Sequence, residues 1–150
     1  MAKPKPKVFL DSSALIAGIA SSKGAAREVL RLAEIGLIDV FISRQVIVEV
    51  DRNIAAKLPE CLNDFRNYLE TLVPILVADP SRRDILRFST LIKPHDAPIL
   101  AAAVMSEADY LVTWDQKHFM TTGPRALDRP KVMDPGEFLH EFRRVLHEKS

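Results

Sequence analysis

Short runs of apolar residues recur along the chain, and longer segments of mixed polarity separate them. Uninterrupted apolar runs of this length are typical of strands that are buried on both faces of a sheet. The predicted strands are residues 8–10, 40–42, 75–77 and 110–112, with a short last strand at 131–133.

The segments between these strands have the apolar spacing of amphipathic helices, as in residues 25–35, where apolar and charged residues fall on opposite faces. Gly36 is placed to end that helix, and Ser81 with Asp84 forms a capping-box pattern before a later one. Helices are predicted from Ser12 or Ser13 to residue 20, and over residues 25–35, 44–58, 59–72, 85–91, 96–108 and 135–148.

Strands that alternate with helices indicate an α/β fold in which helices cover both faces of a parallel sheet. Because crossovers between parallel strands are right-handed, we expect a doubly wound, mostly parallel sheet of four to five strands. No repeat or interior linker interrupts the pattern, so residues 1–150 are predicted to form a single domain, with residues 1–7 as a flexible basic arm. In such folds the active cleft lies beyond the carboxyl ends of the strands.

The composition is that of an ordinary globular domain, with 47% hydrophobic and 27% charged residues. No apolar run approaches the ~20 residues that span a bilayer, so we expect no membrane association and a cytoplasmic location. The single cysteine, Cys61, excludes an internal disulfide and a multi-cysteine zinc site. A net charge of +1 lacks the basic balance of many nucleic-acid binders, but it is compatible with an enzyme that has an acidic cleft and a basic rim.

Four acidic residues fall where the cleft is expected. Asp11 directly follows the first strand, and Asp115 lies three residues after Val112 at the end of the fourth. Asp96 opens the helix that leads into the fourth strand, and Glu49 interrupts an apolar stretch of the helix after the second. Because the carboxyl ends of parallel strands meet at one edge of the sheet, these side chains can converge on one cleft.

Each acid taken alone has a simpler interpretation. Asp11 and Asp96 fit helix N-caps, and Asp115 fits an ordinary loop residue. Glu49 needs a partner if it is buried, and Arg52 or Lys57 is close enough in sequence to pair with it. Together, however, clustered carboxylates repel one another and would not all stay ionised without a cation. Oxygen ligands suit Mg²⁺ or Mn²⁺, and the chemistry that such a site serves is metal-assisted phosphodiester hydrolysis.

Four segments in a fixed order carry a resemblance to a known family. They are residues 8–15, 43–50, 96–103 and 108–115, each containing one of the four acids, the last followed by His118 and Phe119. One segment alone is a weak signal. The ordered set resembles the PIN-domain family, the fold of VapC-type toxin ribonucleases and of several RNA-processing nucleases, and the resemblance covers nearly the whole chain.

The resemblance implies a five-stranded parallel sheet and an endoribonuclease that uses Mg²⁺ or Mn²⁺ to hydrolyse single-stranded or structured RNA. It assigns Asp11, Glu49, Asp96 and Asp115 as the catalytic and metal-binding residues. Family members are often homodimers, and the toxins pair with a small antitoxin protein that fills the cleft. The sequence leaves open whether this chain is a toxin, an RNA-processing nuclease or a binding-only PIN module.

Residues around the acids have supporting or substrate-binding interpretations. Ser13 and Thr113 are expected to hydrogen-bond the carboxylates or a metal-bound water, although both also fit helix or loop caps. Six further residues are candidates for RNA contacts and also fit ordinary surface positions: Arg44, Arg52, Lys93, His95, Lys117 and His118.

Other α/β classes lack their defining residues here. A Rossmann domain needs a glycine-rich turn after the first strand, whereas Asp11 is followed by Ser12, Ser13 and Ala14, and a P-loop is absent on the same grounds. A haloacid-dehalogenase-type phosphatase needs a second Asp where Ser13 stands. A response-regulator receiver needs an Asp at the end of a middle strand and a Lys after a late one, and neither Ser43 nor the segment 113–115 fits.

Overall fold

A sheet of five parallel strands forms the centre of the computed structural model, which describes residues 4–149. Its strand order is β3-β2-β1-β4-β5. The strands are β1 (Lys7–Leu10), β2 (Asp39–Ile42), β3 (Ile75–Leu76), β4 (Tyr110–Val112) and β5 (Lys131–Met133). All five predicted strands are present, and the parallel pairing throughout confirms the doubly wound α/β fold.

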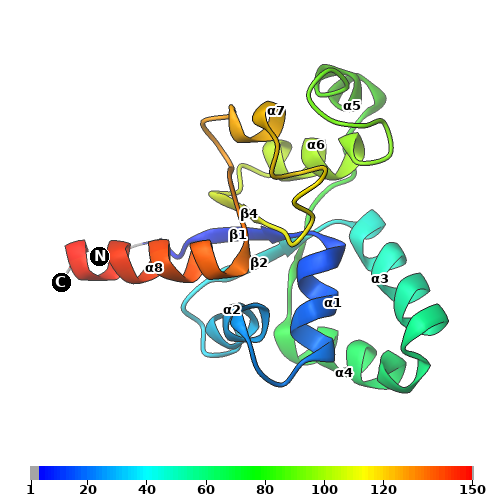
Figure 1. Ribbon diagram of the computed structural model, residues 1–150, viewed down its shortest axis with the longest axis vertical. Helices are drawn as coiled ribbons and strands as arrows, with labels where there is room; N and C mark the ends of the chain where they lie inside the picture. The colour runs from blue at the N-terminus through cyan, green and yellow to red at the C-terminus, as the bar shows by residue number, and fades with distance from the viewer. Residues whose placement is uncertain (1–3, 150) are drawn as a thin grey trace.

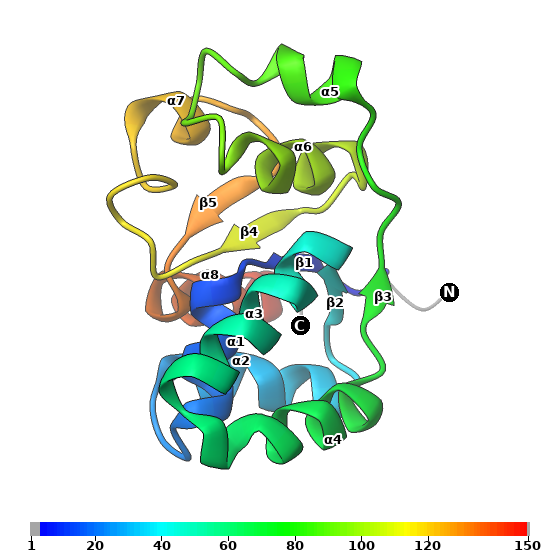
Figure 2. The ribbon, with the colours of Figure 1, turned by 90° about the vertical axis from the view of Figure 1, so that its right-hand side faces the viewer.

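Helices cover both faces of the sheet (Figures 1 and 2). They are α1 (Ser12–Ala20), α2 (Ala25–Glu34), α3 (Arg44–Lys57), α4 (Leu62–Leu72), α5 (Arg82–Arg87), α6 (Ala97–Met105), α7 (Thr122–Arg125) and α8 (Pro135–Lys149), with a 3₁₀ turn, η1 (Pro59–Cys61), before α4. In Figure 1, α5, α6 and α7 lie above the sheet, and α1, α2, α4 and α8 lie below it. Helix α3 contacts both α1 and α6 beside the end of β2. None of the helices in the described part of the chain is long and apolar enough to cross a membrane.

Several helix boundaries differ from the predicted ones. The Ser81 capping box is present, so α5 begins at Arg82 and ends at Arg87 instead of covering residues 85–91. The helix predicted over residues 96–108 ends at Met105, because Glu107 has a left-handed φ of +60° that a helix cannot contain. The single turn α7 was not predicted, because one turn is too short to show a hydrophobic period.

The end of the predicted flexible arm belongs to the sheet. Lys7 is the first residue of β1, and its N–H donates to Asp109 Oδ2 at 2.8 Å. The carbonyl of Pro6 accepts from Asp39 N at 3.0 Å. These bonds hold Pro6 and Lys7 against the neighbouring segments, although the lack of apolar residues predicted no fixed structure for the arm. Residues 1–3 lie outside the described part of the chain.

Strand β1 lies at the middle of the sheet. The strand is flanked by β2 and β4, and Phe9 in it is fully buried. The chain builds outward from β1 to β3 and then returns to the other side of β1 to form β4 and β5. Strand order therefore reverses between β1 and β4, and the crevice at such a reversal is where α/β proteins bind their ligands. Asp11 N donates to Val112 O at 3.3 Å across this point.

Candidate functional site

Asp11 joins the end of β1 to the start of α1. It is the N-cap of α1, and its Oδ1 accepts hydrogen bonds from Ala14 N at 3.0 Å and from Ser13 Oγ at 2.8 Å. Its Oδ2 accepts from Thr113 Oγ1 at 2.5 Å, and the residue is only 2% exposed. Asp11 therefore caps a helix and also lies as a buried acid at the carboxyl edge of the sheet; one role does not exclude the other.

A hydroxyl network ties the loop after β4 to the start of α1. Ser13 Oγ lies 3.3 Å from Thr113 Oγ1 and accepts from Trp114 N at 2.9 Å. Thr113 Oγ1 in turn accepts from Asp115 N at 2.8 Å, and Thr113 is fully buried. These bonds fix the position of Asp115 relative to Asp11, although the two residues are 104 positions apart in the sequence.

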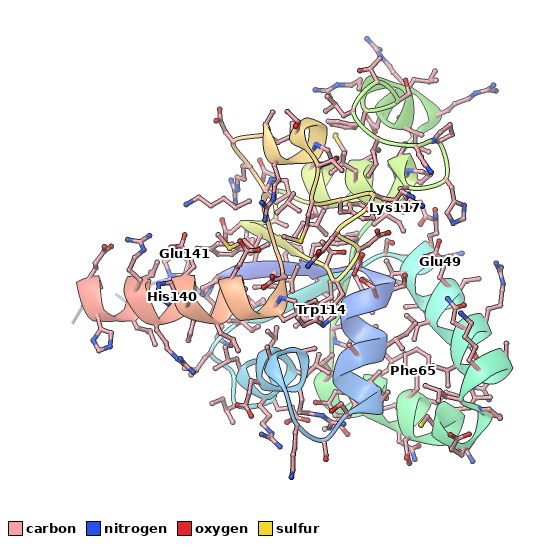
Figure 3. The ribbon with its side chains drawn as sticks, in the orientation of Figure 1. Glu49, Phe65, Trp114, Lys117, His140 and Glu141 are labelled. Carbon is pink, nitrogen blue, oxygen red and sulfur yellow. The ribbon has the colours of Figure 1, made fainter. Side chains whose placement is uncertain are left out.

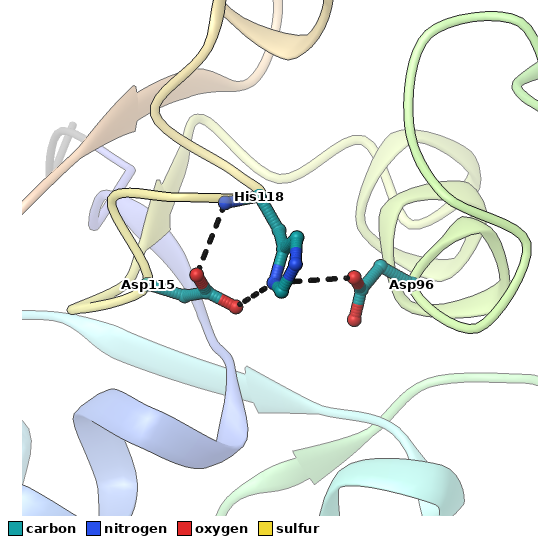
Figure 4. A group of neighbouring side chains, drawn as sticks. All are labelled: Asp96, Asp115 and His118. Carbon is teal, nitrogen blue, oxygen red and sulfur yellow. Dashed lines mark hydrogen bonds and ion pairs between the residues drawn. The ribbon is translucent and has the colours of Figure 1, made fainter.

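Asp96, Asp115 and His118 form the tightest group of potential metal ligands in the described part of the chain (Figure 4). One ligand atom from each residue lies within 4.8 Å of the others. His118 Nδ1 is 2.9 Å from Asp115 Oδ2 and 3.7 Å from Asp96 Oδ2. His118 N also donates to Asp115 Oδ1 at 3.0 Å. The histidine thus lies between two carboxylates that come from different segments, one at the start of α6 and one in the loop after β4.

Asp96 does not act as the helix cap that its position alone suggested. It stands at the N-cap position of α6, but its backbone is in the αR region and its side chain makes no capping hydrogen bond. Among residues 4–149 its carboxylate accepts no hydrogen bond, and its ion-pair partner is His118. Because the Asp96 side chain is only 12% exposed, water stabilises its charge poorly. An acid in this state has oxygen atoms that are available to a cation.

Glu49 lies on α3 (Figure 3), close enough to Asp96 for its negative charge to raise the pKa of that acid. Its side chain is 13% exposed, and its Oε1 lies 3.2 Å from both Gln45 Nε2 and His95 Nε2. Gln45 also donates to the carbonyl of His95 at 3.3 Å, which ties α3 to the loop before α6. The simpler alternative, an ion pair of Glu49 with Arg52 or Lys57, is not present in the described part of the chain: both of these residues are exposed, and Glu49 contacts Gln45 and His95 instead. Glu49 Oε2 has no hydrogen-bond donor among the described residues.

The pKa values show that the acids influence one another. Burial raises the pKa of Asp11 to about 6, and the negative charge of Asp115 adds to this rise, although hydrogen bonds from Thr113, Ala14 and Ser13 oppose it. Burial also raises the pKa of Asp96. His118 and His95 lower that pKa, while Asp115 and Glu49 raise it further. The four predicted acids therefore belong to one electrostatic cluster, although only two of them lie in the tightest ligand group.

Four of the candidate RNA-binding residues are exposed: Arg44, Arg52, Lys93 and Lys117. Their side chains do not enter the acid cluster, and Arg44 lies 3.9 Å from Asp79. The two candidate histidines, in contrast, contact the acids directly.

Two residues at the cleft had no role in the prediction from sequence. Gln45 holds Glu49, and its spacing of four residues on one helix face is a signal that could have identified it. Trp114 is 41% exposed although it lies between buried Thr113 and the partly buried Asp115. A large aromatic side chain that stays exposed beside an acidic site is unusual, and the only tryptophan of the chain falling inside the motif 113–115 was its signal.

A second hollow lies at the opposite edge of the sheet, where the strands begin. Lys5, Lys7, Asp109 and Arg129 line this cavity of about 510 Å³. Within it, Arg129 Nη2 lies 3.0 Å from Asp109 Oδ1, and the N–H of Lys7 in the arm donates to the other oxygen of Asp109. It is therefore explained by the packing of the arm against β4, and the acid cluster stays the candidate site.

Solved structures share this fold. The chain resembles the crystal structure of PAE2754 from Pyrobaculum aerophilum with a TM-score of 0.62 and 16% identity, over 90% of this chain and 88% of that one. VapBC2 from Rickettsia felis bound to a DNA fragment from their promoter matches with a TM-score of 0.60 and 17% identity, over 85% of this chain and 97% of that one. FitAcB from Neisseria gonorrhoeae matches with a TM-score of 0.57 and 20% identity, over 85% of this chain and 97% of that one. At these identities the likeness is one of fold.

Among curated proteins, a sequence search finds no match. The family model of the PIN domain, in contrast, matches residues 7–117, a range that begins with β1 and includes all four acids of the cluster. The match covers most of the chain and agrees with the fold, so the chain belongs to the PIN-domain family of nucleases.

Proposed function

We propose that this protein is a divalent-metal-dependent endoribonuclease whose centre consists of Asp11, Glu49, Asp96 and Asp115. The observation that carries the proposal is the state of Asp96, a largely buried carboxylate that accepts no hydrogen bond from residues 4–149 and lies in reach of a second acid. Such an arrangement is costly for the protein alone and becomes favourable when a cation is shared between the acids.

The side chains present fit a hard divalent ion. Asp96 and Asp115 would hold Mg²⁺ or Mn²⁺ through oxygen atoms, and such ions bind to few protein carboxylates and keep several waters. Asp11 already accepts three hydrogen bonds of the roughly four that a carboxylate can accept. It therefore has room for one further contact, to a water or to the ion.

Glu49 is the side chain that we assign to receive a proton. Phosphodiester hydrolysis requires a water that loses a proton as its oxygen bonds to phosphorus, and a bound metal makes that water more acidic. Glu49 Oε1 is held in place by Gln45 and His95, whereas Oε2 has no donor among the described residues. A carboxylate oriented through one oxygen and open at the other is suited to accept a proton.

Exposed cations and an exposed aromatic ring support a single-stranded nucleic acid as the substrate, and the resemblance to PIN-domain ribonucleases points to RNA. Lys93 and Lys117 are exposed within three residues of Asp96 and Asp115, and Arg44 is exposed at the start of α3, so these cations are available to phosphates of the backbone. The exposed ring of Trp114 offers a surface on which a base can stack, which requires an unpaired base. Both features support a single-stranded substrate over a duplex.

The assignment is tested by cleavage of single-stranded RNA in Mg²⁺ or Mn²⁺ and in EDTA. Asp11→Asn and Asp96→Asn should each lower the rate by orders of magnitude while the far-UV circular dichroism stays unchanged. Asp134→Asn is the control, because Asp134 accepts from Glu137 N before α8, away from the cleft. Full activity in EDTA, or in both cleft variants, would show that this centre does not cleave RNA.

Within this function, we propose a role as the toxin of a toxin–antitoxin pair. The likeness in fold to the VapBC2 and FitAcB structures supports this role, as does the resemblance to VapC-type toxins. The partners would then be a small antitoxin that covers the cleft and a second copy of the chain. Expression of the protein alone should arrest growth, and Asp11→Asn should relieve the arrest; unimpaired growth with soluble, active nuclease would instead favour RNA processing.

A further inference from the structure

One histidine nitrogen belongs to the ligand group of Asp96 and Asp115. We propose that His118 Nδ1 is a direct ligand of the metal ion, together with Asp96 and Asp115, and that it makes the centre prefer Mn²⁺ to Mg²⁺. This inference rests on the proposed function, since it concerns the same ion, but it adds a ligand and a metal preference that the four acids alone do not imply.

The distance from His118 Nδ1 to Asp115 is that of neighbouring ligands, and the distance to Asp96 is somewhat longer. Two ligand atoms that each lie about 2.1 Å from an ion, at right angles, are about 3 Å apart. His118 Nδ1 lies 2.9 Å from Asp115 Oδ2 and 3.7 Å from Asp96 Oδ2 (Figure 4). The nitrogen therefore already occupies a position from which it can share an ion with both acids.

The loop holds this histidine in place. His118 N donates to Asp115 Oδ1, and the carbonyl of His118 accepts from Thr121 Oγ1 at 3.2 Å. The next residue, Phe119, is buried in the core and its N–H donates to the carbonyl of Asp115 at 3.0 Å. The His118 side chain is 27% exposed, compared with 76% for His95 at the same cleft. The ring is thus positioned by the fold instead of moving freely at the surface.

A nitrogen ligand changes which ion is favoured. Mg²⁺ binds oxygen almost exclusively, whereas transition-metal ions also accept imidazole, and they bind a given mixed site more tightly along the series that starts with Mn²⁺. Ligation requires the lone pair of Nδ1, so the ring carries its proton on Nε2 in the metal-bound state. The carboxylates satisfy either ion, and the imidazole distinguishes between them.

The competing interpretation is that His118 only orients Asp115 through a hydrogen bond. In that case the histidine would stay outside the coordination sphere, and its loss would weaken the binding of both ions to the same extent. The two interpretations differ in whether nitrogen is bonded to the metal and in the ratio of the two affinities.

Electron spin echo spectroscopy of the Mn²⁺-loaded protein tests the first difference, because it detects nitrogen bonded to the ion. We expect ¹⁴N modulation in the wild type that changes on labelling with ¹⁵N-histidine, persists in His95→Asn and disappears in His118→Asn. Calorimetric titration tests the second: His118→Asn should lose Mn²⁺ affinity on the order of tenfold, and Mg²⁺ affinity much less.

Three outcomes would overturn the inference: Mn²⁺ bound by the wild type without histidine-nitrogen modulation, modulation that survives in His118→Asn, or an equal loss of affinity for both ions. The wild-type spectrum decides the question even if His118→Asn does not fold. Failure of the proposed function looks different, because then the wild type would bind neither ion in the calorimeter.

Discussion

Asp11 should make the metal-free protein lose stability as the pH rises, and Asp11→Asn should remove that loss. The pKa of Asp11 is about 6 in the folded protein, compared with 3.8 for an unperturbed side chain, chiefly because the residue is buried. The folded state therefore holds its proton more tightly than the unfolded state does. The stability that this proton provides is fully present below about pH 4 and is lost as the pH rises through about 6.

The size of the effect follows from the shift in pKa. A difference of about two units corresponds to roughly 3 kcal/mol in the free energy of unfolding. Asn keeps an oxygen that can accept from Ala14 N, and its amide can donate to Thr113 Oγ1, so the hydrogen bonds lost should cost about 1 kcal/mol. Asp11→Asn should thus be slightly less stable than the wild type near pH 4 and clearly more stable near pH 7.

Urea unfolding in EDTA, followed by the fluorescence of Trp114, measures this difference across the pH range. Asp134→Asn, which removes an acid outside the cleft, should keep the wild-type loss of stability. Addition of Mn²⁺ near pH 7 should reverse the order, because the ion stabilises the wild type by mass action. A wild-type-minus-variant difference that stays constant with pH would refute the reasoning, since Asp11 would then not be the group that titrates.

Three further outcomes test other parts of the site. In EDTA, Asp96→Ala should be at least as stable as the wild type, because no capping hydrogen bond is lost, and in thermal unfolding Mn²⁺ should raise its midpoint far less than that of the wild type; an equal rise would place the ion elsewhere. Thr113→Val should cost about 1–3 kcal/mol in urea unfolding and lower nuclease activity, because Asp11 Oδ2 and Asp115 N both lose a partner, and Thr113→Ser should restore both properties. Single-stranded RNA should quench the emission of Trp114 in EDTA, and Trp114→Leu should weaken RNA binding by about 1–3 kcal/mol; unchanged emission on saturation with RNA would argue against stacking.

The strands and the edge that carries the site could be predicted from the sequence. Runs such as residues 8–10 and 110–112 are apolar at every position because both faces of these strands are covered, and this leaves a pattern that is visible without coordinates. Asp11 follows such a run directly, so its place at the carboxyl edge was determined by its neighbours in the chain. The same local logic located the capping box of Ser81.

Contacts between distant segments were decided only by the tertiary structure. Thr113 donates to Asp11 from 102 positions away, and His95 pairs with Glu49 across two elements of the cleft, because strand order brings these segments together. Asp96 has the sequence context of a helix cap, yet its αR backbone turns the carboxylate away from the N–H groups it would cap. From the sequence alone His118 is an ordinary loop histidine, and only the fold shows that two acids lie beside its ring. Sequence patterns record what each residue needs from its near neighbours, whereas the partners of a side chain in a cleft depend on which strands lie next to each other.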